Sequence, residues 1–306
     1  MSRYLVTGGA GFIGSHLVES LLAEGHVARV LDDLSTGRRE NLPPAAELIL
    51  GDVADPATTS AAMAGMDGCF HLAAIASVAR AAEDWPGTHR VNLGGTVAVL
   101  DAARARRVPV VFASSAAVYG DCADRPLTEA APTHPLSAYG ADKLGSELHA
   151  AVATGVFGVP TVGLRFFNVF GPRQDPASPY SGVISVFAGR LRAGAPLVLH
   201  GDGEQTRDFV FVADVVAALL AAMAWRGGTA AVFNVCSGRA TSIRELAATL
   251  AAIAGLPPRL TEGSPRPGDI RHSLGSPEAS RAALGLGPPI PLAEGLAAVW
   301  AWLGRP

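Results

Sequence analysis

Residues 7–14 read Thr7-Gly8-Gly9-Ala10-Gly11-Phe12-Ile13-Gly14, a GxxGxxG pattern that follows the strand-like run Tyr4–Thr7 and opens a segment of helical period. Gly8 permits a tight turn, Gly11 lets the backbone approach a diphosphate at the positive end of a helix, and Gly14 lets helix and strand pack closely. An ordinary strand-to-helix turn is the alternative. The order of strand, loop and helix favours a dinucleotide-binding turn. Its candidate cofactor-binding residues are Gly8, Gly11, Phe12, Ile13 and Gly14.

Short β-branched runs alternate with Ala- and Leu-rich segments of helical period after this loop. Strands that are apolar on both faces belong in a parallel sheet with helices on each side. We therefore predict an α/β fold, a Rossmann-like doubly wound parallel sheet with a smaller mixed α/β substrate-binding lobe. The expected strands are Tyr4–Thr7, Val27–Leu31, Leu48–Leu50, Gly68–His71, Pro109–Ala113 and Pro160–Arg165.

The alternation changes beyond Asn168, because residues 171–182 are rich in Pro, Gly and Ser. We predict a dinucleotide-binding domain over residues 1–167. Residues 168–306 are expected to form mainly the second lobe, with some segments returning to the first domain. The helix-like segments Asp214–Trp225, Ser242–Gly255 and Leu292–Leu303 indicate that this second part is folded.

Composition narrows the class of protein. Of the 306 residues, 49% are hydrophobic and 17% are charged, a balance that favours a packed globular protein. The net charge of −3 offers no broad cationic face, so we expect neither nucleic acid nor a membrane surface as a partner. The longest uncharged stretch, Leu148–Leu164, is too short and too interrupted to span a bilayer. With no leader-like start, the sequence predicts a cytoplasmic protein.

No metal site is expected, because Cys69, Cys122 and Cys236 lack ligand spacing and are interpreted as reduced thiols. The histidines His71, His134, His149 and His200 show no ligand spacing either, so we interpret each as satisfied or solvated.

Asp32 follows the second predicted strand, where an acid can accept hydrogen bonds from the adenosine ribose hydroxyls. Its charge favours NAD, because it would repel the extra phosphate of NADP, although Arg38 and Arg39 lie close in sequence. A solvated loop acid is the alternative for Asp32. Asp52, followed by Val53, is a second candidate that could accept a bond from the adenine amino group, and simple loop capping is its alternative.

Tyr139 and Lys143 are four residues apart, which places them on one face of a helix that Ser137 could cap. A phenol is a poor base at neutral pH because its ordinary pKa is about 10. Lowering that pKa by about three units takes roughly 4 kcal/mol, which Lys143 and an oxidised nicotinamide ring could supply together. Ser114 and Ser115 stand at the carboxyl end of the fifth strand, where open α/β sheets bind ligands. That position favours a shared site over a surface pair.

These motifs together resemble the extended short-chain dehydrogenase/reductase family, and within it the UDP-hexose 4-epimerases. The resemblance covers nearly the whole chain and is more specific for the family than for the sugar. The segments that carry it are TGGAGFIGSH (Thr7–His16), LDDLSTG (Leu31–Gly37), HLAA (His71–Ala74), NLGGT (Asn92–Thr96), SSAAVYG (Ser114–Gly120), YGADK (Tyr139–Lys143), RFFNVFGPRQDP (Arg165–Pro176), GDGEQTRDFVFVADV (Gly201–Val215) and RPGD (Arg266–Asp269).

The resemblance implies an NAD-dependent UDP-hexose 4-epimerase whose catalytic residues are Ser115, Tyr139 and Lys143. Asn92 would support that region, and Lys143 would also contact the nicotinamide ribose. Tyr139 would take the proton of the sugar 4-hydroxyl while hydride leaves C4 for NAD, and Ser115 would bond the same oxygen. A transient 4-keto sugar results, and return of hydride to its opposite face inverts C4.

By the same resemblance, the second lobe holds the UDP-sugar. Arg207 and Arg266 are expected on the diphosphate, Asn168 adds a contact there, and Asp269 meets the nucleotide ribose. An ion pair with Asp208 is the alternative for Arg207, and plain exposure is the alternative for Arg266.

The segment around Ser273 resembles the one that limits space beside the sugar C2 substituent. Because Ser273 is small, we expect UDP-N-acetylglucosamine and its galacto epimer to fit as well as UDP-glucose and UDP-galactose.

Five other readings remain open. Ala116 and Ala117 stand where related 4,6-dehydratases carry an acidic pair, which disfavours a dehydratase, and a missing acid likewise disfavours a UDP-glucuronate decarboxylase. A UDP-glucuronate 4-epimerase is the nearest rival, and an NAD-binding redox sensor without catalysis or a plain NAD-linked oxidoreductase is less favoured. By analogy with the family, a homodimer is expected through Gly94–Arg106 and Tyr139–Val156.

Overall fold

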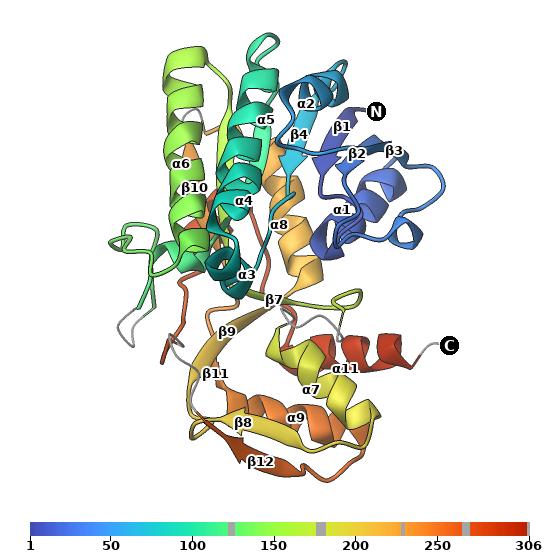
Figure 1. The fold of residues 1–306 in the computed structure, drawn as a ribbon, viewed down its shortest axis with the longest axis vertical. Helices are drawn as coiled ribbons and strands as arrows, with labels where there is room; N and C mark the ends of the chain where they lie inside the picture. Colours follow the sequence, from blue (N-terminus) through green and yellow to red (C-terminus); the bar gives the residue numbers. More distant parts are fainter. Residues whose placement is uncertain (122–125, 176–181, 228–229, 265–269, 305–306) are drawn as a thin grey trace.

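A seven-stranded parallel sheet forms the centre of the upper lobe (Figure 1). In this computed structural model, residues 1–121, 126–175, 182–227, 230–264 and 270–304 are described. The strand order β10-β6-β5-β4-β1-β2-β3 reverses beside β1, as in a doubly wound fold. The predicted Rossmann-like class is therefore confirmed. The strands are β1 (Arg3–Thr7), β2 (Val27–Asp32), β3 (Glu47–Leu50), β4 (Gly68–His71), β5 (Val110–Ser115), β6 (Thr161–Phe166) and β10 (Ala231–Val235).

Helices cover both faces of this sheet because its strands are apolar on both sides. Leu5 and Val6 show the alternation, since they are both fully buried but belong to different cores. The core that contains Val6 lies under α1 (Phe12–Ala23) and α8 (Val212–Ala224). The core that contains Leu5 lies under α2 (Pro56–Met63), α5 (Gly95–Arg104) and α6 (Ala138–Phe157).

Shorter elements complete this lobe. They are α3 (Val78–Glu83), α4 (Trp85–His89), the π-helical turn Arg90–Gly94, the 3-10 turns Arg39–Asn41 and Ala116–Val118, and α10 (Glu278–Leu284).

The lower lobe of Figure 1 has its own hydrophobic core. Two small sheets, in the orders β11-β9-β7 and β12-β8, pack with three helices around Phe170, Leu199 and Leu246. The strands are β7 (Asn168–Phe170), β8 (Leu197–His200), β9 (Thr206–Phe211), β11 (Ala240–Ser242) and β12 (Leu260–Gly263). The helices are α7 (Val183–Arg192), α9 (Ile243–Ala254) and α11 (Leu292–Leu303).

The chain passes between the lobes more than once. Although β10 comes after β9 in sequence, it pairs in parallel with β6 of the large sheet, and α8 packs against α1. The division into domains at residue 168 stays a prediction. None of the helices in the described part of the chain combines the length and apolar character that a bilayer crossing requires.

Candidate active site

The glycine-rich loop connects β1 to α1 and depends on two close backbone approaches. Gly8 has a φ of +71°, and a Cβ there would lie 2.7 Å from the backbone nitrogen of Ala73. A Cβ on Gly14 would lie 2.2 Å from the carbonyl oxygen of Gly8, so any side chain would push α1 away from the loop. The first-turn residues Phe12 and Ile13 are half-buried.

Gly11 leaves the start of α1 open. A Cβ on Gly11 would meet only the Gly8 carbonyl, at 3.2 Å. Gly11 is also the N-cap residue of α1 and makes no side-chain cap hydrogen bond. The first N–H groups of the helix therefore receive no acceptor from their N-cap side chain, and they are free to bind an anion.

Asp32 fastens the glycine-rich loop to the end of β2. The Asp32 side chain is 7% exposed, and its two oxygens accept from the backbone N–H groups of Ala10 and Leu34, both at 2.9 Å. Burial raises the pKa of the Asp32 carboxyl, while these two hydrogen bonds oppose the rise. Asp32 is thus not the solvated loop acid of the alternative reading. Each carboxylate oxygen keeps a second lone pair that can accept from a ribose hydroxyl.

Asp52 follows β3, and Asn92 lies in the π-helical turn before α5. Asp52 accepts from the backbone N–H of Ala54 at 2.8 Å and pairs with Arg90 at 2.6 Å, so it does cap its loop. Val53 beside it is buried. Asn92, in the π-helical turn, is 1% exposed and binds both backbone polar groups of Ile75. Such π-helical turns occur often at functional sites.

The three predicted catalytic residues meet at the carboxyl end of β5. Ser115 ends that strand and accepts from the backbone N–H of Ala117 at 3.1 Å, and its side chain lies near enough to Tyr139 to influence the pKa of that phenol. Tyr139 lies in the first turn of α6, which Ser137 caps by accepting from the Gly140 N–H, as predicted. The Lys143 Nζ lies 5.8 Å from the centre of the Tyr139 ring.

Burial dominates the protonation of these side chains. It raises the pKa of Tyr139, and the nearby Ser115 side chain only opposes the rise. It lowers the pKa of Lys143 to about 8, against the attraction of Asp142. The ammonium of Lys143 donates to the carbonyl oxygen of Ala113 at 2.8 Å. In the chain by itself the pKa of Tyr139 is therefore raised, and its lowering by Lys143 together with an oxidised nicotinamide ring stays a prediction.

His71 is a satisfied core residue, as interpreted from the sequence. Its Nδ1 contacts the Thr7 hydroxyl at 2.8 Å and its Nε2 contacts the Thr96 hydroxyl at 3.1 Å. Burial, together with the nearby charge of Lys143, lowers the pKa of His71 to about 3. His71 is therefore neutral at physiological pH.

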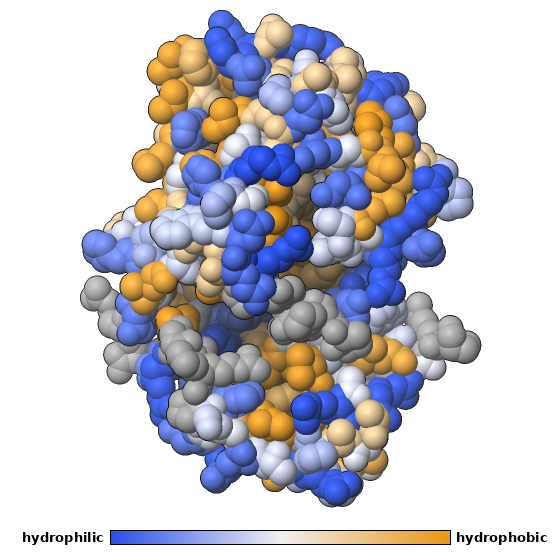
Figure 2. Space-filling model, in the orientation of Figure 1, coloured by the Kyte–Doolittle hydropathy of each residue, from blue (hydrophilic) through white to orange (hydrophobic). Residues whose placement is uncertain are grey.

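Three predicted substrate residues come together in the lower lobe. Asn168 starts β7 and is exposed, and β7 pairs with β9, which carries Arg207. Ser273 is buried, and its N–H donates to the carbonyl oxygen of Thr206, the residue before Arg207, at 3.2 Å. Figure 2 shows the surface hollowed between the two lobes. Arg266 and Asp269, the other two predicted substrate residues, lie outside the described residues.

The surroundings of Arg207 differ from the alternative reading. Asp208 is fully buried and accepts from the N–H groups of Ser237, Gly238 and Gly275, not from Arg207. Arg207 donates to the carbonyl oxygen of Thr206 at 2.8 Å.

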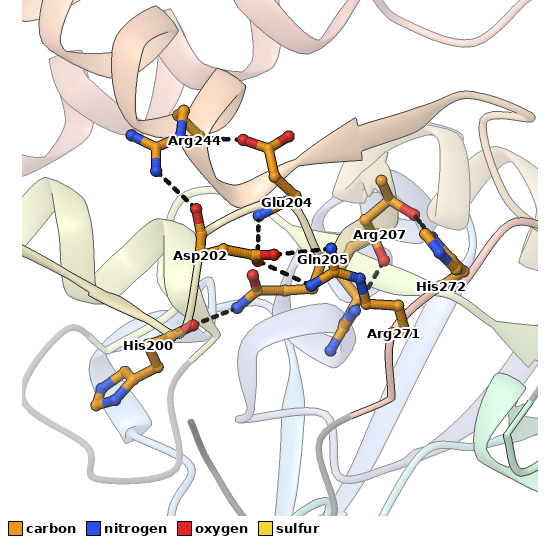
Figure 3. A network of polar contacts seen from close by, with 9 residues as sticks. His200, Asp202, Glu204, Gln205, Arg207, Arg244, Arg271 and His272 are labelled. Carbon is orange, nitrogen blue, oxygen red and sulfur yellow. Dashed lines mark hydrogen bonds and ion pairs between the residues drawn. The ribbon is translucent and has the colours of Figure 1, made fainter. Parts of the chain in front are cut away.

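The polar network around Arg207 is drawn in Figure 3. Arg271 donates to both oxygens of Asp202, at 2.8 and 2.9 Å, and His272 contacts the Thr206 hydroxyl at 3.0 Å. These contacts hold the segment that leads to Ser273 against the start of β9.

The sequence analysis did not predict a buried ion pair that lies next to the predicted catalytic residues, between Glu147 on α6 and Arg165 on β6. Glu147 binds Arg165 through two hydrogen bonds and also accepts from the Ser114 hydroxyl. A signal was present, because Tyr139, Lys143 and Glu147 follow a spacing of four residues on one helix face. A charged residue on a face that packs against a sheet needs a partner.

Residues 4–236 match the model of the NAD dependent epimerase/dehydratase family. The chain belongs to that family. It is similar to the UDP-glucose 4-epimerase of Mycolicibacterium smegmatis, with 41% identity over 303 residues and 96% of each chain covered. The predicted family, enzyme class and cofactor, NAD, are confirmed at the level of the family.

Two solved structures are similar over the whole epimerase-family chain. UDP-glucose 4-epimerase of Thermotoga maritima, with UDP-glucose, is 34% identical, with 98% of both chains covered and a TM-score of 0.94. UDP-N-acetylglucosamine 4-epimerase of Methanobrevibacter ruminantium, in complex with UDP-N-acetylmuramic acid, is 33% identical and covers 99% of this chain and 98% of its own, again with a TM-score of 0.94.

The residues present fit NAD. The open Gly11 face and the uncapped N-terminus of α1 suit a diphosphate, and Asp32 stands at the end of the neighbouring strand with acceptor capacity left. Arg38, which could have favoured an extra phosphate, forms an ion pair with Asp175 at 2.5 Å.

Proposed function

We propose that this enzyme is a UDP-hexose 4-epimerase that interconverts UDP-glucose and UDP-galactose. The observation that carries the proposal is that Ser115, Tyr139 and Lys143 meet at the carboxyl end of β5, with no acid at Ala116 or Ala117. This set can move one proton at one sugar hydroxyl, and it lacks the second acid or base that eliminating water needs. The similarity to UDP-glucose 4-epimerases supports the same substrate class.

In this proposal the chain's own side chains handle one proton. Tyr139 takes it from the sugar 4-hydroxyl, and Ser115 donates a hydrogen bond to the same oxygen. The Lys143 ammonium, held by the Ala113 carbonyl, stabilises the phenolate while the proton is held. The glycine-rich loop and Asp32 would hold NAD, which would supply hydride chemistry at sugar carbon 4 and add a positive charge beside Tyr139.

The diphosphate grip of the proposal comes from the lower lobe. Arg207 supplies a guanidinium fork, and Asn168 adds an amide on the neighbouring strand. Such a grip is needed because the sugar must turn over between losing and regaining hydride without leaving. Arg266 and Asp269 keep their proposed roles on the diphosphate and the ribose.

We further propose that UDP-N-acetylglucosamine and its galacto epimer are substrates. Ser273 is small and lies against Thr206, next to Arg207 in sequence. Replacing it by Ser273→Tyr adds an aromatic ring at this position, which should lower turnover of the acetylated pair more than turnover of the glucose pair. Initial rates on both pairs measure this selectivity. Equal losses on the two pairs would refute the role of Ser273.

Proton NMR of the reaction mixture tests the function directly. The purified enzyme is incubated separately with UDP-glucose, UDP-N-acetylglucosamine and UDP-glucuronate, and the H4 couplings of the sugar are followed. The proposal expects the galacto pattern with the first two. Conversion of UDP-glucuronate alone would replace it with a UDP-glucuronate 4-epimerase, and NAD binding with no conversion would favour a redox sensor.

We also propose that two copies of this chain pair through α5 and α6. These helices lie side by side in Figure 1, and Leu148, Val152 and Val156 form an exposed apolar row on α6 with Val97 exposed on α5. Figure 2 shows hydrophobic residues gathered over this part of the upper lobe. Apolar rows of this kind mark protein interfaces.

The cytoplasmic location stays a prediction from the sequence.

A further inference from the structure

A buried cluster of three polar side chains lies beside the catalytic residues. The Ser114 hydroxyl donates to Glu147 Oε1 at 2.5 Å. Arg165 donates from Nε to Glu147 Oε1 at 2.9 Å and from Nη2 to Glu147 Oε2 at 2.7 Å. All three residues are at least nine-tenths buried. The carboxylate of Glu147 is thus bound by three donors from two strands.

Two members of the cluster, Ser114 and Glu147, belong to elements that carry proposed catalytic residues. Ser114 precedes Ser115 on β5, and in the sheet register it lies directly opposite Arg165 on β6. Glu147 stands on α6 one turn beyond Lys143 and two turns beyond Tyr139. The cluster therefore fastens α6 to β5 and β6 next to Ser115 and within two turns of Tyr139.

The energetics of such a cluster favour a geometric role. A buried ion pair gains little net stability, because the cost of removing both charges from water is comparable to their attraction. A bidentate Arg–carboxylate pair does fix distance and orientation. Catalysis is sensitive to both, since a misplacement of about 1 Å can cost about 100-fold in rate.

The cluster continues toward the lower lobe. Arg165 Nη1 donates to the Tyr119 hydroxyl at 2.8 Å, and that hydroxyl donates to Asn234 Oδ1 at 2.7 Å. Asn234 Nδ2 donates to the carbonyl oxygen of Leu127 at 2.8 Å. The N–H of Leu127 in turn donates to the carbonyl oxygen of Leu274, at 2.9 Å. Leu274 follows Ser273, so the chain of contacts reaches the segment proposed to face the sugar.

We propose that the Glu147–Arg165 pair is the positioning unit of the active site: through Ser114 it aligns Ser115 with Tyr139, and through Tyr119 and Asn234 it aligns the segment after Ser273 with both. This inference rests on the proposed function. It makes Ser114, Tyr119, Glu147 and Arg165 positioning residues, which act through the groups that touch substrate.

The two ends of the unit predict different kinetic effects. Ser114→Ala removes the tether to β5 and leaves the ion pair intact, so kcat for UDP-glucose should fall roughly 10- to 100-fold while KM stays nearly unchanged. Tyr119→Phe removes the link toward Leu127 and Leu274, so it should mainly raise KM. These mild variants avoid Glu147→Gln, which would leave a buried guanidinium without its counter-ion and endanger folding.

A matched control comes from the other end of the same elements. The Thr161 hydroxyl is buried, donates to the carbonyl oxygen of Ala150, and so also ties β6 to α6, but at the amino end of the strand. Thr161→Val removes it without changing the side-chain shape. Its kcat and KM should equal those of the unaltered enzyme. A loss of kcat in Thr161→Val equal to that in Ser114→Ala would overturn the proposal.

A spectroscopic readout separates this proposal from the proposed function. In the NAD-loaded protein, ultraviolet titration with Tyr139→Phe as the subtracted reference isolates the ionisation of Tyr139. Ser114→Ala should move it to higher pH, because a displaced Ser115 no longer bonds the phenolate well. An unmoved titration refutes positioning by Ser114, whether or not the enzyme is active. A moved titration in an enzyme that converts no UDP-sugar would leave positioning standing and reject the function.

Discussion

Lys143 is a buried cation whose charge depends on pH. Only 4% of its surface is exposed, and burial lowers the pKa of its ammonium to about 8 from an ordinary value of about 10.4. Because the charged form is the disfavoured one in the folded protein, its cost to stability is fully present below pH 8 and disappears as the pH rises toward the ordinary pKa. The enzyme thus gains a catalytic charge that it can hold only up to mildly alkaline pH.

This placement predicts an alkaline limb in the pH profile. As the pH rises through about 8, Lys143 loses its proton and no longer stabilises the Tyr139 phenolate, so kcat/KM should fall. In Lys143→Arg the guanidinium stays protonated, and the limb should vanish even though the overall rate is lower. Steady-state rates between pH 6 and 10 measure both. The same limb in Lys143→Arg would show that another group titrates there.

At the scale of elements, α1 can approach β1 only because Gly14 has no side chain. A Cβ at this point would meet the Gly8 carbonyl and the Cα of Gly9, both of them backbone atoms that cannot move aside alone. The contact fixes the N-terminus of α1 above the loop, where the diphosphate is expected to bind. The geometry of one helix end therefore depends on the smallest residue in the motif.

Gly14→Ala should lower both stability and NAD retention. The added methyl must push α1 outward, which we expect to cost about 1–3 kcal/mol or more of the free energy of unfolding. Urea unfolding and the NAD content of the purified protein measure the two effects. Gly287→Ala, in the loop after α10 and away from the proposed dimer face, is the control: nothing lies within 4 Å of its Cβ position, so stability and NAD content should be unchanged. Equal behaviour of the two variants would contradict the packing argument.

Local sequence patterns predicted the helices and strands better than they predicted the contacts between them. The strand Gly68–His71 and the helix Leu292–Leu303 have the expected bounds, since a short apolar run and a clear helical period need no distant information. Ser242 and Gly255, the expected ends of another helix, are its N-cap and C-cap. The strand β10 was not foreseen, because its place beside β6 depends on the chain returning from the lower lobe.

The site shows the same division. The motif residues around Gly11, Ser115 and Tyr139 were found because their spacing is local. The spacing of Tyr139, Lys143 and Glu147 indicates that Glu147 faces the sheet, but its partners Arg165 and Ser114 lie 18 and 33 positions away on other elements, so local spacing does not identify them. The raised pKa of Tyr139 also escaped prediction, because burial is a property of the folded chain.

At the scale of the whole molecule, the two lobes supply different parts of the proposed reaction. The large sheet carries the dinucleotide loop and the proton-handling residues, while the lower lobe carries the side chains proposed to hold the nucleotide of the substrate. Ser115 lies opposite Phe166 in the sheet register, and Asn168 follows Phe166 by two residues. The end of β6 therefore leads from the level of Ser115 directly into the lower lobe. The outer face of α5 and α6 is the face proposed to contact a second copy.

Charge placed on that face should separate the dimer. We expect Leu148→Glu to give a monomer in light scattering at micromolar concentration, because the side chain is 63% exposed in the single chain and would be buried between two copies. Leu256→Glu, on an exposed leucine after α9 in the lower lobe, is the control and should remain dimeric. A dimer that persists in Leu148→Glu would place the contact elsewhere.

In the proposed reaction one phenol, that of Tyr139, carries the proton of the sugar 4-hydroxyl. The most direct measurement is the interconversion rate of UDP-glucose and UDP-galactose by Tyr139→Phe, with bound NAD assayed in the same sample. We expect the variant to retain NAD and to lose at least about 100-fold in rate, which is the lower end of the rate enhancement that one general acid–base group contributes. An unchanged rate with NAD bound would contradict it.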